Sequence, residues 1–406
     1  MSRRFITIAV LWFLVNIYFF QAIKTVFPDQ RVWLAYWLYE GVLFGLVLFT
    51  ILTVRRTVNT SRVVFGFFSL MLISFAPKMV AIPILLVEDL YRLLTTGAHL
   101  FGIGQTTSAG LAGRSRLVSE FAIGIAALPF FSLIYGMVNG KYNYRLHKLT
   151  LKFADLPEAF DGFTITQLSD IHSGSFDNKP AVEKGIALAN AQNSDLILFT
   201  GDLVNNTATE MNDYIDSFSK LKARYGKFSV LGNHDYGDYV KWETPEEKVA
   251  NLDALKAVHP KIGFKLLLNE SVQIEKDGQH ITLTGVENWG KGSFVKHGNL
   301  TKATAGVNDT EFKILMSHDP SHWKAEILAF PKHINLTLAG HTHGMQFGVE
   351  LPFFKWSPVK YIYPEWAGIY SENDKYINVN RGFGFLGYPG RFGILPEITV
   401  ITLVKG

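Results

Sequence analysis

The chain has 406 residues, of which 48% are hydrophobic and only 18% are charged, and its mean hydropathy is +0.15. This composition excludes a disordered chain and is atypical of a soluble protein, so membrane segments are expected. The absence of cysteine excludes disulfide scaffolds, cysteine-based zinc or iron–sulfur sites and thiol catalysis.

Charge is divided unevenly along the chain. Residues 1–150 carry 14 Lys and Arg against 5 Asp and Glu, a net +9, whereas the remainder carries 25 against 30, a net −5. The positive charge lies in the apolar half, where it suits lipid headgroups better than nucleic acid. We therefore expect a membrane, and no nucleic acid, among the partners.

Four apolar stretches predict membrane-spanning helices at residues 5–23, 32–54, 63–87 and 117–138. Arg3 and Arg4 precede the first stretch and no small-residue cleavage site follows it, which favours an uncleaved anchor over a signal peptide. Pro77 and Pro83 interrupt the third stretch, so it is expected to be a kinked helix, with a re-entrant element as the alternative.

Four spans would place the N-terminus and the residues after 140 on the same side of a multi-pass membrane protein. That side carries eight Lys and Arg against five on the opposite side, which favours the cytoplasm. Glu40, Lys78 and Glu120 fall within the predicted spans. A transport pathway, snorkelling to the membrane interface or pairing between helices would each account for such residues.

After residue 150, short β-branched runs alternate with polar helical stretches, which is typical of an α/β domain. The predicted helices are 180–192, 210–224 and 246–258. The predicted strands are 163–167, 195–199, 227–231, 281–285, 312–316, 334–338, 376–380 and 398–403. We expect a transmembrane region at 1–140, a linker at 141–159 and a single α/β domain at 160–406.

Five polar motifs follow predicted strands. They are DIH at 170–172, GD at 201–202, GNHD at 232–235, SHD at 317–319 and GHTHG at 340–344. Because the carboxyl ends of neighbouring strands in an open α/β sheet face one crevice, the motifs are expected to converge. Clustered carboxylates and imidazoles are costly to bury unless a cation neutralises them, and a mixed nitrogen and oxygen donor set suits manganese, iron, zinc or related ions.

The order of these motifs resembles that of the calcineurin-like metallophosphoesterases, in their membrane-anchored branch, over roughly residues 160–405. The resemblance implies an α/β fold of four layers, with two mixed sheets flanked by helices, after a bundle of about four transmembrane helices. In that branch GHTHG is commonly followed by Gly-Gln, whereas this chain has Met345-Gln346. That departure should alter the rim of the site more than the metals.

The resemblance also implies two divalent metal ions bridged by Asp202. The first ion would be held by Asp170, His172, Asp202 and His343. The second would be held by Asp202, Asn233, His318 and His341. His234 would direct a hydrogen bond or proton to the phosphoryl group or leaving oxygen, with Asp235 supporting it. Further candidates for supporting the ligands or contacting a phosphate are Asp319, His322, Arg381 and Arg391.

Together these features predict a membrane-anchored hydrolase that cleaves a phosphomonoester, phosphodiester or pyrophosphate by metal-activated hydroxide. Anchoring favours a lipid-linked substrate, and a nucleotide or phosphoprotein is also compatible. The alternatives are a non-catalytic metal-binding scaffold and a regulatory domain of a membrane transporter or receptor. An aromatic-rich segment at 347–370 is interpreted either as a lipid-facing rim or as core packing.

Overall fold

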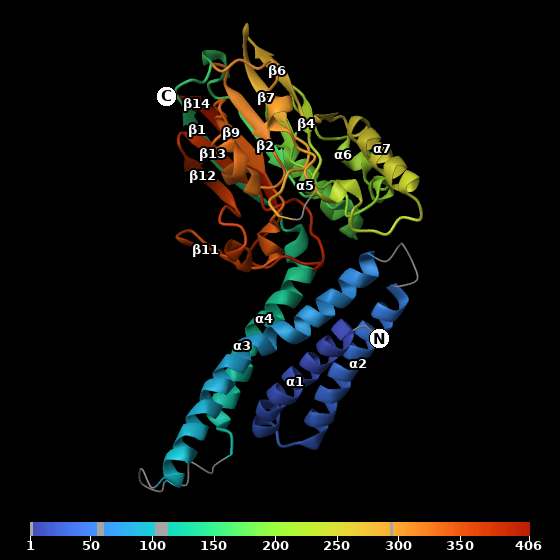
Figure 1. The fold of residues 1–406 in the computed structure, drawn as a ribbon, viewed down its shortest axis with the longest axis vertical. Coiled ribbons are helices and arrows are strands. Elements are labelled where there is room, and N and C mark those ends of the chain that lie inside the picture. The colour runs from blue at the N-terminus through green and yellow to red at the C-terminus, as the bar shows by residue number, and fades with distance from the viewer. Residues whose placement is uncertain (1–2, 55–60, 102–112, 293–294) are drawn as a thin grey trace. The chain divides into compact units, whose positions relative to one another are not determined.

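The computed structural model describes residues 3–54, 61–101, 113–292 and 295–406. The chain forms two compact units, Met1–Tyr135 and Gly136–Gly406, called here the membrane unit and the C-terminal unit (Figure 1). The described helices of the membrane unit are α1 (Arg3–Val26), α2 (Gln30–Val54), α3 (Ser61–Leu100) and α4 (Arg116–Val138), of which the last three residues belong to the C-terminal unit. Each of the four contains an apolar stretch long enough to cross a bilayer.

The third helix is longer than expected. It continues through Pro77 and Pro83, past the predicted end at residue 87, to Leu100, so it is not re-entrant. The added part is rich in leucine, which favours helix. Its acidic residues Glu88 and Asp89 both pair with Arg114, which supplies the opposite charge that an apolar environment demands.

Small residues bring the helices of the membrane unit together. Ala22 of α1, Ala81 of α3 and Ala122 and Ala126 of α4 are buried in one cluster with Phe19. In lipid, small side chains let helix backbones approach closely, and that close packing replaces the hydrophobic driving force available in water. Many large apolar side chains of the same helices face outward, as expected for contact with lipid.

Two of the charged residues in the predicted spans pair with each other. Lys78 Nζ of α3 lies 2.7 Å from Glu40 Oε1 of α2, and the Ser74 hydroxyl donates to Glu40 Oε2 at 2.8 Å. All three side chains are buried. The exposed Glu120 instead pairs with Arg116 one turn away on α4. Pairing between and within helices therefore accounts for Glu40, Lys78 and Glu120. These three charged residues do not require a transport pathway to explain them.

Breaking the buried pair should destabilise the membrane unit strongly. We expect Lys78→Met to lower the free energy of unfolding by about 3–5 kcal/mol, because Glu40 then remains buried without a counter-charge. The double variant with Glu40→Gln should recover most of that loss, since neither charge remains. Thermal unfolding in detergent measures both, with Glu120→Gln as the exposed control. Equal destabilisation of the single and double variants would contradict this expectation.

The C-terminal unit is built on two six-stranded sheets. Their strand orders are β1-β14-β2-β3-β4-β5 and β12-β13-β9-β8-β7-β6, while β10 and β11 form a separate hairpin. Strands β2 to β5 are parallel in the first sheet, and β7, β8, β9 and β13 are parallel in the second. The strand bounds are β1 Arg145–Phe153, β2 Thr164–Leu168, β3 Leu196–Phe199, β4 Lys227–Ser229, β5 Lys265–Leu266, β6 Glu270–Lys276, β7 Gln279–Gly285, β8 Lys313–Met316, β9 Leu336–Ala339, β10 Val349–Leu351, β11 Phe354–Trp356, β12 Gly368–Glu372, β13 Lys375–Val379 and β14 Glu397–Lys405.

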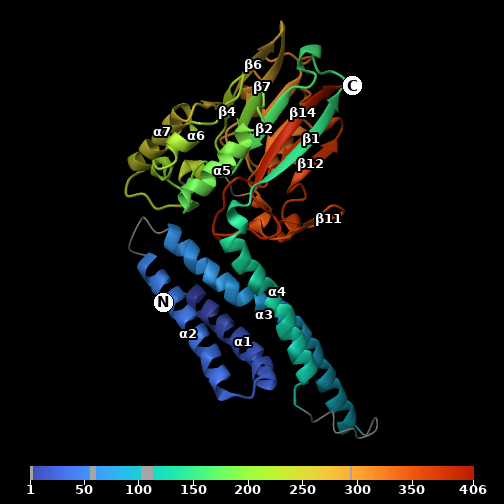
Figure 2. The ribbon, with the colours of Figure 1, turned by 180° about the vertical axis from the view of Figure 1, so that it is seen from behind.

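Helices cover the outer faces of the two sheets. Their bounds are α5 Lys179–Asn190, α6 Ile215–Phe218, α7 Pro245–Lys261 and α8 Leu300–Ala303. An inner core joins the sheets through residues such as Ile165 and Ile314. Helices α5 to α7 pack on the first sheet (Figure 2), and α8 packs on the second together with the short helix η6 (Trp323–Ile327). The predicted four-layer α/β architecture is confirmed.

Two local predictions are wrong. Residues 145–153, expected in a linker, form β1, which pairs in parallel with β14 along its whole length because Leu149, Leu151 and Phe153 alternate with polar residues. Residues 210–224, expected as one helix, are split between η4 (Ala208–Met211) and α6. A capping box at Thr207 starts η4, and Asn190 binds the backbone after α6 in an irregular loop.

A buried histidine on α7 should make the stability of this unit sensitive to acid. His259 is fully buried with its Nδ1 2.8 Å from Ser229 Oγ, and burial lowers its pKa from 6.5 to about 3. Below pH 6.5 the His259 imidazole binds a proton more readily in the unfolded chain than in the folded one. Its contribution to the free energy of unfolding is therefore fully present above pH 6.5 and is lost as the pH falls toward about 3.

We expect His259→Gln to flatten this dependence, because an amide takes up no proton in this range. The unfolding temperature of the variant in detergent should fall less than that of the parent between about pH 7 and about pH 5. His280→Gln, at a half-exposed histidine, is the matched control. Parallel pH curves for the parent and the His259 variant would rule out this contribution.

Candidate metal centre

The five polar motifs lie at the carboxyl ends of five strands. Asp170 and His172 follow β2, Asp202 follows β3 and Asn233 follows β4 in the first sheet. The second sheet contributes His318 after β8 and the two histidines of GHTHG after β9. Residues far apart in sequence therefore meet at one edge of the sandwich, as the parallel strands predict.

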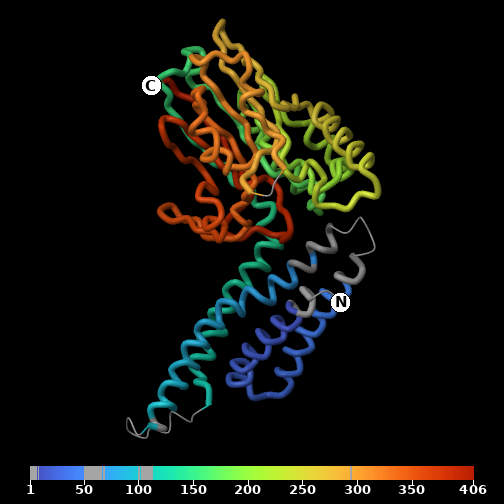
Figure 3. The backbone as a smooth tube through the Cα atoms, in the orientation of Figure 1, coloured from blue at the N-terminus to red at the C-terminus, as the bar shows by residue number. Residues whose placement is uncertain are grey.

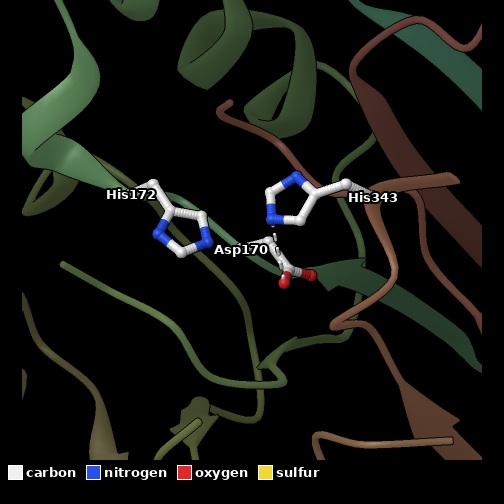
Figure 4. Close-up of side chains that lie close together, drawn as sticks. All are labelled: Asp170, His172 and His343. Atoms are coloured by element: carbon white, nitrogen blue, oxygen red, sulfur yellow. Dashed lines mark ion pairs between the residues drawn. The ribbon is translucent and has the colours of Figure 1, made fainter. Parts of the chain in front are cut away.

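The side chains fall into two groups, each able to hold a metal ion. Asp170, His172 and His343 form the first group, and their candidate ligand atoms lie within 4.8 Å of one another (Figure 4). The second group contains Asp202, His318 and His341. All members are buried except His341, which is partly exposed.

Asp202 lies within reach of both groups. Its Oδ2 is 3.2 Å from His318 Nε2 in the second group and 3.5 Å from His172 Nε2 in the first. Asn233 Oδ1 lies 3.1 Å from His318 Nε2 and 2.8 Å from His341 Nδ1, so the amide oxygen faces the second group. This is the arrangement that a shared carboxylate and a neutral oxygen ligand require.

The backbone at the site adopts a conformation that non-glycine residues rarely take. The φ angle is positive at Asp170 (51°), His172 (48°), Asp202 (61°), His341 (70°) and His343 (50°). Each such residue costs of order 1–3 kcal/mol and persists only where the surroundings enforce it. The loops after these strands are therefore held in an unfavourable backbone conformation in which these five side chains lie at the site.

Close packing of the motif glycines leaves no room for larger residues. A Cβ at Gly340 would lie 1.9 Å from Ser169 Oγ and 2.2 Å from Asp170 Oδ2. A Cβ at Gly232 would lie 2.2 Å from Asp202 Oδ1. Glycine is therefore required where GHTHG and GNHD approach the carboxylates.

Burial and mutual charge set the protonation of the cluster. Burial lowers the pKa of His172 to about 3 and also lowers that of His343, so both imidazoles are neutral at pH 7, the form that binds metals. Burial also opposes ionisation of Asp202, but the charges of His318 and His234 hold the pKa of Asp202 well below its usual range. Burial raises the pKa of Asp170 to about 6.

Several buried polar atoms in the first group have no hydrogen-bond partner. These atoms are His172 Nδ1, His172 Nε2 and His343 Nε2. An unsatisfied buried nitrogen is costly, and nearly all such atoms in folded proteins have a partner. Together with the carboxylates, this donor set fits divalent cations.

His234 occupies the space beside both groups without joining either. Its Nδ1 lies 2.8 Å from the carbonyl oxygen of Asn205, and its backbone N–H donates to Asp202 Oδ1 at 2.9 Å. Its ring centroid is 4.9 Å from that of His172 and 4.4 Å from that of Tyr239. The contact with Asn205 therefore fixes the Nδ1 edge of the imidazole, and Nε2 lies on the opposite edge of the ring.

Asp235 does not support His234 in the way expected. Its carboxylate accepts hydrogen bonds from the backbone N–H groups of Gly232 (2.8 Å), Asp202 (2.9 Å) and Leu203 (2.8 Å). It therefore shapes the loop after β3 that carries Asp202.

The two candidate arginines have different surroundings. Arg381 is buried and pairs with Glu397 and Glu350, so its charge is already compensated, and the structure does not favour the expected phosphate contact. Arg391 is fully buried, and its Nη2 donates to His343 Nδ1 at 2.9 Å. Burial lowers the pKa of Arg391 only to about 10, so it remains charged at pH 7 and orients His343.

Asp319 and His322, the two candidates that follow His318, have different partners. Asp319 Oδ2 lies 3.6 Å from His341 Nε2, and Asp319 Oδ1 accepts a hydrogen bond from the backbone of Ser321. His322 is bound instead to the Ser317 hydroxyl and to Glu326.

Two tyrosines at the site could not be recognised from the sequence. The Tyr363 hydroxyl lies 2.9 Å from His341 Nε2, and the Tyr239 hydroxyl accepts a hydrogen bond from Asn233 Nδ2 at 2.8 Å. Tyr363 lies in the aromatic segment, whose role the sequence left open, and Tyr239 follows GNHD in no recognisable motif. Only the fold brings them to the ligands.

A four-layer α/β sandwich with histidine and aspartate groups at its strand ends places the protein in the class of metallophosphoesterase folds. Residues 163–345 match the calcineurin-like phosphoesterase family, and residues 2–141 match the transmembrane domain of probable calcineurin-like phosphoesterases. The chain belongs to the calcineurin-like metallophosphoesterase family, in a branch with a transmembrane domain, and is a membrane protein.

Similar proteins occur in bacteria and animals. The uncharacterized metallophosphoesterase YkuE of Bacillus subtilis is 33% identical over 63% of this chain and 83% of its own length. The transmembrane protein with metallophosphoesterase domain of Danio rerio is 25% identical over 82% of this chain and 74% of its own. Among solved structures, phosphopantetheinyl hydrolase from Mycobacterium tuberculosis is 14% identical over 54% of this chain and 89% of that one, with a TM-score of 0.33.

Proposed function

We propose that this protein is a membrane-anchored hydrolase of phosphoester bonds that uses two divalent cations. The observation that carries the proposal is the convergence of two buried groups of histidine and aspartate at one sheet edge, on backbone held in a left-handed conformation. Strain of this kind is concentrated at functional sites. A purely structural cluster would not require it.

Each cation has a distinct set of proposed ligands. The first set is Asp170, His172, Asp202 and His343. The second set is Asp202, Asn233, His318 and His341. Asp202 is assigned to both because its Oδ2 lies within 3.5 Å of an imidazole nitrogen from each group. Manganese, iron and zinc suit such mixed donors.

The residues around the cations would position and protonate the substrate. Two divalent cations held by these residues would polarise phosphoryl oxygens and lower the pKa of water toward neutral. His234 is free to direct Nε2 at the leaving oxygen, because Asn205 engages Nδ1. Arg391 keeps the His343 ring fixed, and Asp235 keeps the Asp202 loop fixed. We assign His234 as the proton donor to the leaving group.

The substrate class follows from the site and the anchor. Phosphomonoesters, phosphodiesters and pyrophosphates all present the oxygens that such a site recognises. A site tethered to a bilayer meets lipid headgroups at high effective concentration, which favours a lipid-linked phosphoester. The other candidate function is a metal-binding scaffold without turnover, and the presence of His234 beside the ligand groups argues against it.

The deciding experiment uses the full chain in detergent, stripped of metal with a chelator and reloaded separately with Mn²⁺, Fe²⁺, Zn²⁺ or Mg²⁺. We expect about two ions per chain by mass spectrometry. We also expect metal-dependent turnover of p-nitrophenyl phosphate or bis-p-nitrophenyl phosphate. Bound ions without turnover of either ester would favour the scaffold, and no bound ion would overturn the proposal.

We also propose that the C-terminal unit faces the cytoplasm, on the strength of the Lys and Arg excess on its side of the predicted spans. Because the chain contains no cysteine, a single Lys222→Cys variant can be labelled selectively. A membrane-impermeant maleimide should label it only after cell lysis. Pro28→Cys, between α1 and α2, should be labelled in intact cells, and the reverse pattern would overturn this orientation.

A further inference from the structure

The segment that follows GHTHG carries an exposed apolar surface. Its residues, called here the apolar rim, are Met345, Leu351, Phe353, Phe354, Tyr361 and Ile362. Phe353 is 88% exposed and Tyr361 is 75% exposed. In the rest of the described C-terminal unit, exposed large apolar side chains occur more singly, as at Tyr239 and Val249. A gathered apolar patch of this kind marks an interaction surface.

The apolar rim is exposed although the segment beneath it is folded. Strands β10 and β11 pair with Leu351 opposite Phe354, and Ser357 begins the short helix η8 (Pro358–Tyr361). A small core under the rim contains Val359 and Trp366. The hairpin projects from the sandwich as the segment labelled β11 in Figure 1 and as the same orange-red tube in Figure 3. A defined framework therefore presents these side chains outward.

The charges of this segment favour an anionic surface as the partner. Glu350 pairs with Arg381, and Glu365 pairs with Lys324. Lys360 lies over the ring of the exposed Tyr361, and Lys355 is exposed next to Phe354. Aromatic rings with neighbouring lysines are the composition of protein surfaces at a membrane interface.

The framework of the rim is hydrogen-bonded to the loop that carries the candidate ligands His341 and His343. Ser357 Oγ donates to the carbonyl oxygen of Gly344 at 2.7 Å, and Thr342 Oγ1 donates to that of Trp366 at 2.7 Å. Tyr363 OH lies 2.9 Å from His341 Nε2. The framework that presents the rim and the loop that carries these ligands are thus parts of one hydrogen-bonded structure.

The rim is also connected to the residues at which the chain enters the C-terminal unit. Gly136, at the end of α4, accepts a hydrogen bond from the backbone N–H of Arg391 at 3.1 Å. Gln346 Nε2 donates to the carbonyl oxygens of Tyr388 (2.7 Å) and Gly390 (3.1 Å) in the same loop. The loop that binds Gln346 and the first residue of the C-terminal unit are therefore hydrogen-bonded parts of the same unit.

We propose that the apolar rim docks into the lipid interface of the bilayer that anchors the protein and delivers phosphoester lipid headgroups to the metal centre. The delivery part rests on the proposed phosphoesterase function, whereas the docking part does not. The lipid surface is preferred over a second protein because the chain has its own membrane spans and the rim combines aromatic side chains with lysines.

Docking can be measured without any activity. A nitroxide on a single Phe353→Cys, in the otherwise cysteine-free full chain, reports its surroundings in vesicles of phosphatidylcholine and phosphatidylglycerol. We expect the label to collide with oxygen and to be shielded from a water-soluble nickel complex. A label at the exposed Glu275→Cys on β6 should show the opposite behaviour. Equal access of nickel to both labels, or shielding of Phe353→Cys from both reagents, overturns docking, and the second result points to a protein partner.

Delivery is tested by separating lipid from soluble substrates. We expect Phe353→Ser with Phe354→Ser to lower hydrolysis of phosphatidic acid in vesicles about tenfold or more, with p-nitrophenyl phosphate turnover unchanged. If the parent prefers bis-p-nitrophenyl phosphate, phosphatidylglycerol replaces phosphatidic acid. Equal rates of parent and variant on the lipid overturn delivery. A parent that turns over neither soluble ester contradicts the phosphoesterase function, and the label measurement still decides docking.

Discussion

Asp202→Asn should release both cations and lower phosphoester turnover by roughly a thousandfold or more, since several kcal/mol of transition-state stabilisation depend on the metals. Asp202 Oδ2 lies 3.2 Å from His318 Nε2 and 3.5 Å from His172 Nε2, which is why we propose this carboxylate as the ligand shared by the two cations. Asparagine keeps the shape and the acceptor for the His234 backbone N–H but removes the negative charge. Loss of charge, rather than loss of packing, is what this variant measures.

The measurement combines metal content per chain with turnover under saturating Mn²⁺. Asp216→Asn makes the same change at an exposed aspartate that pairs with Lys179 on the same unit, and it should leave both quantities unchanged. Thermal unfolding of both variants in chelator controls for misfolding. If Asp202→Asn retains about two ions and a rate within tenfold of the parent, Asp202 is not the bridging ligand.

The convergence of the motifs could be predicted from the sequence because each motif follows a buried strand. Asp170 lies two residues after the end of β2 and His318 lies two residues after the end of β8. Parallel strands bring their carboxyl ends together whatever lies between them in sequence. The periodic apolar runs before the motifs are local signals. Strand order and the packing of the two sheets depend on contacts between distant residues. They could be predicted only from the resemblance to a known family.

The features that the sequence missed depend on contacts between distant residues. Strand β1 pairs with β14, and its partner lies about 250 residues away at the other end of the domain. Its alternating pattern in RLHKLTLKF was visible, but only the fold supplies the partner that makes it a strand. A fragment beginning at residue 150 would therefore cut through β1 and leave part of β14 unpaired.

The hydrogen-bond partners of individual side chains could not be predicted from the sequence. Asp235 follows His234 in the motif, yet its carboxylate binds the Asp202 loop, and His234 is held by the carbonyl oxygen of Asn205. Tyr363 reaches His341 from an aromatic segment in which no residue stands out by type. Hydrogen bonds of this kind are fixed by loop conformation, including the left-handed φ angles, which residue type alone does not predict.

Replacing His234 should slow the chemical step without releasing the cations. His234 belongs to neither ligand group, and Asn205 holds its Nδ1 at 2.8 Å, so Nε2 remains to protonate the leaving oxygen. We expect His234→Gln to lower kcat by about 10²–10⁴, the range of general acid catalysis, with about two ions still bound. Tyr239→Phe, which retains the ring beside His234, is the matched control and should lose far less.

The chemistry of the leaving group separates acid catalysis from simple positioning. An alkyl phosphate has a poor leaving oxygen that needs a proton in the transition state, whereas p-nitrophenolate leaves readily without one. The loss of kcat in His234→Gln should therefore be much larger for the alkyl ester than for the p-nitrophenyl ester. An equal loss for both would assign His234 to binding the phosphoryl group, and a fall in metal content would assign it to the ligands.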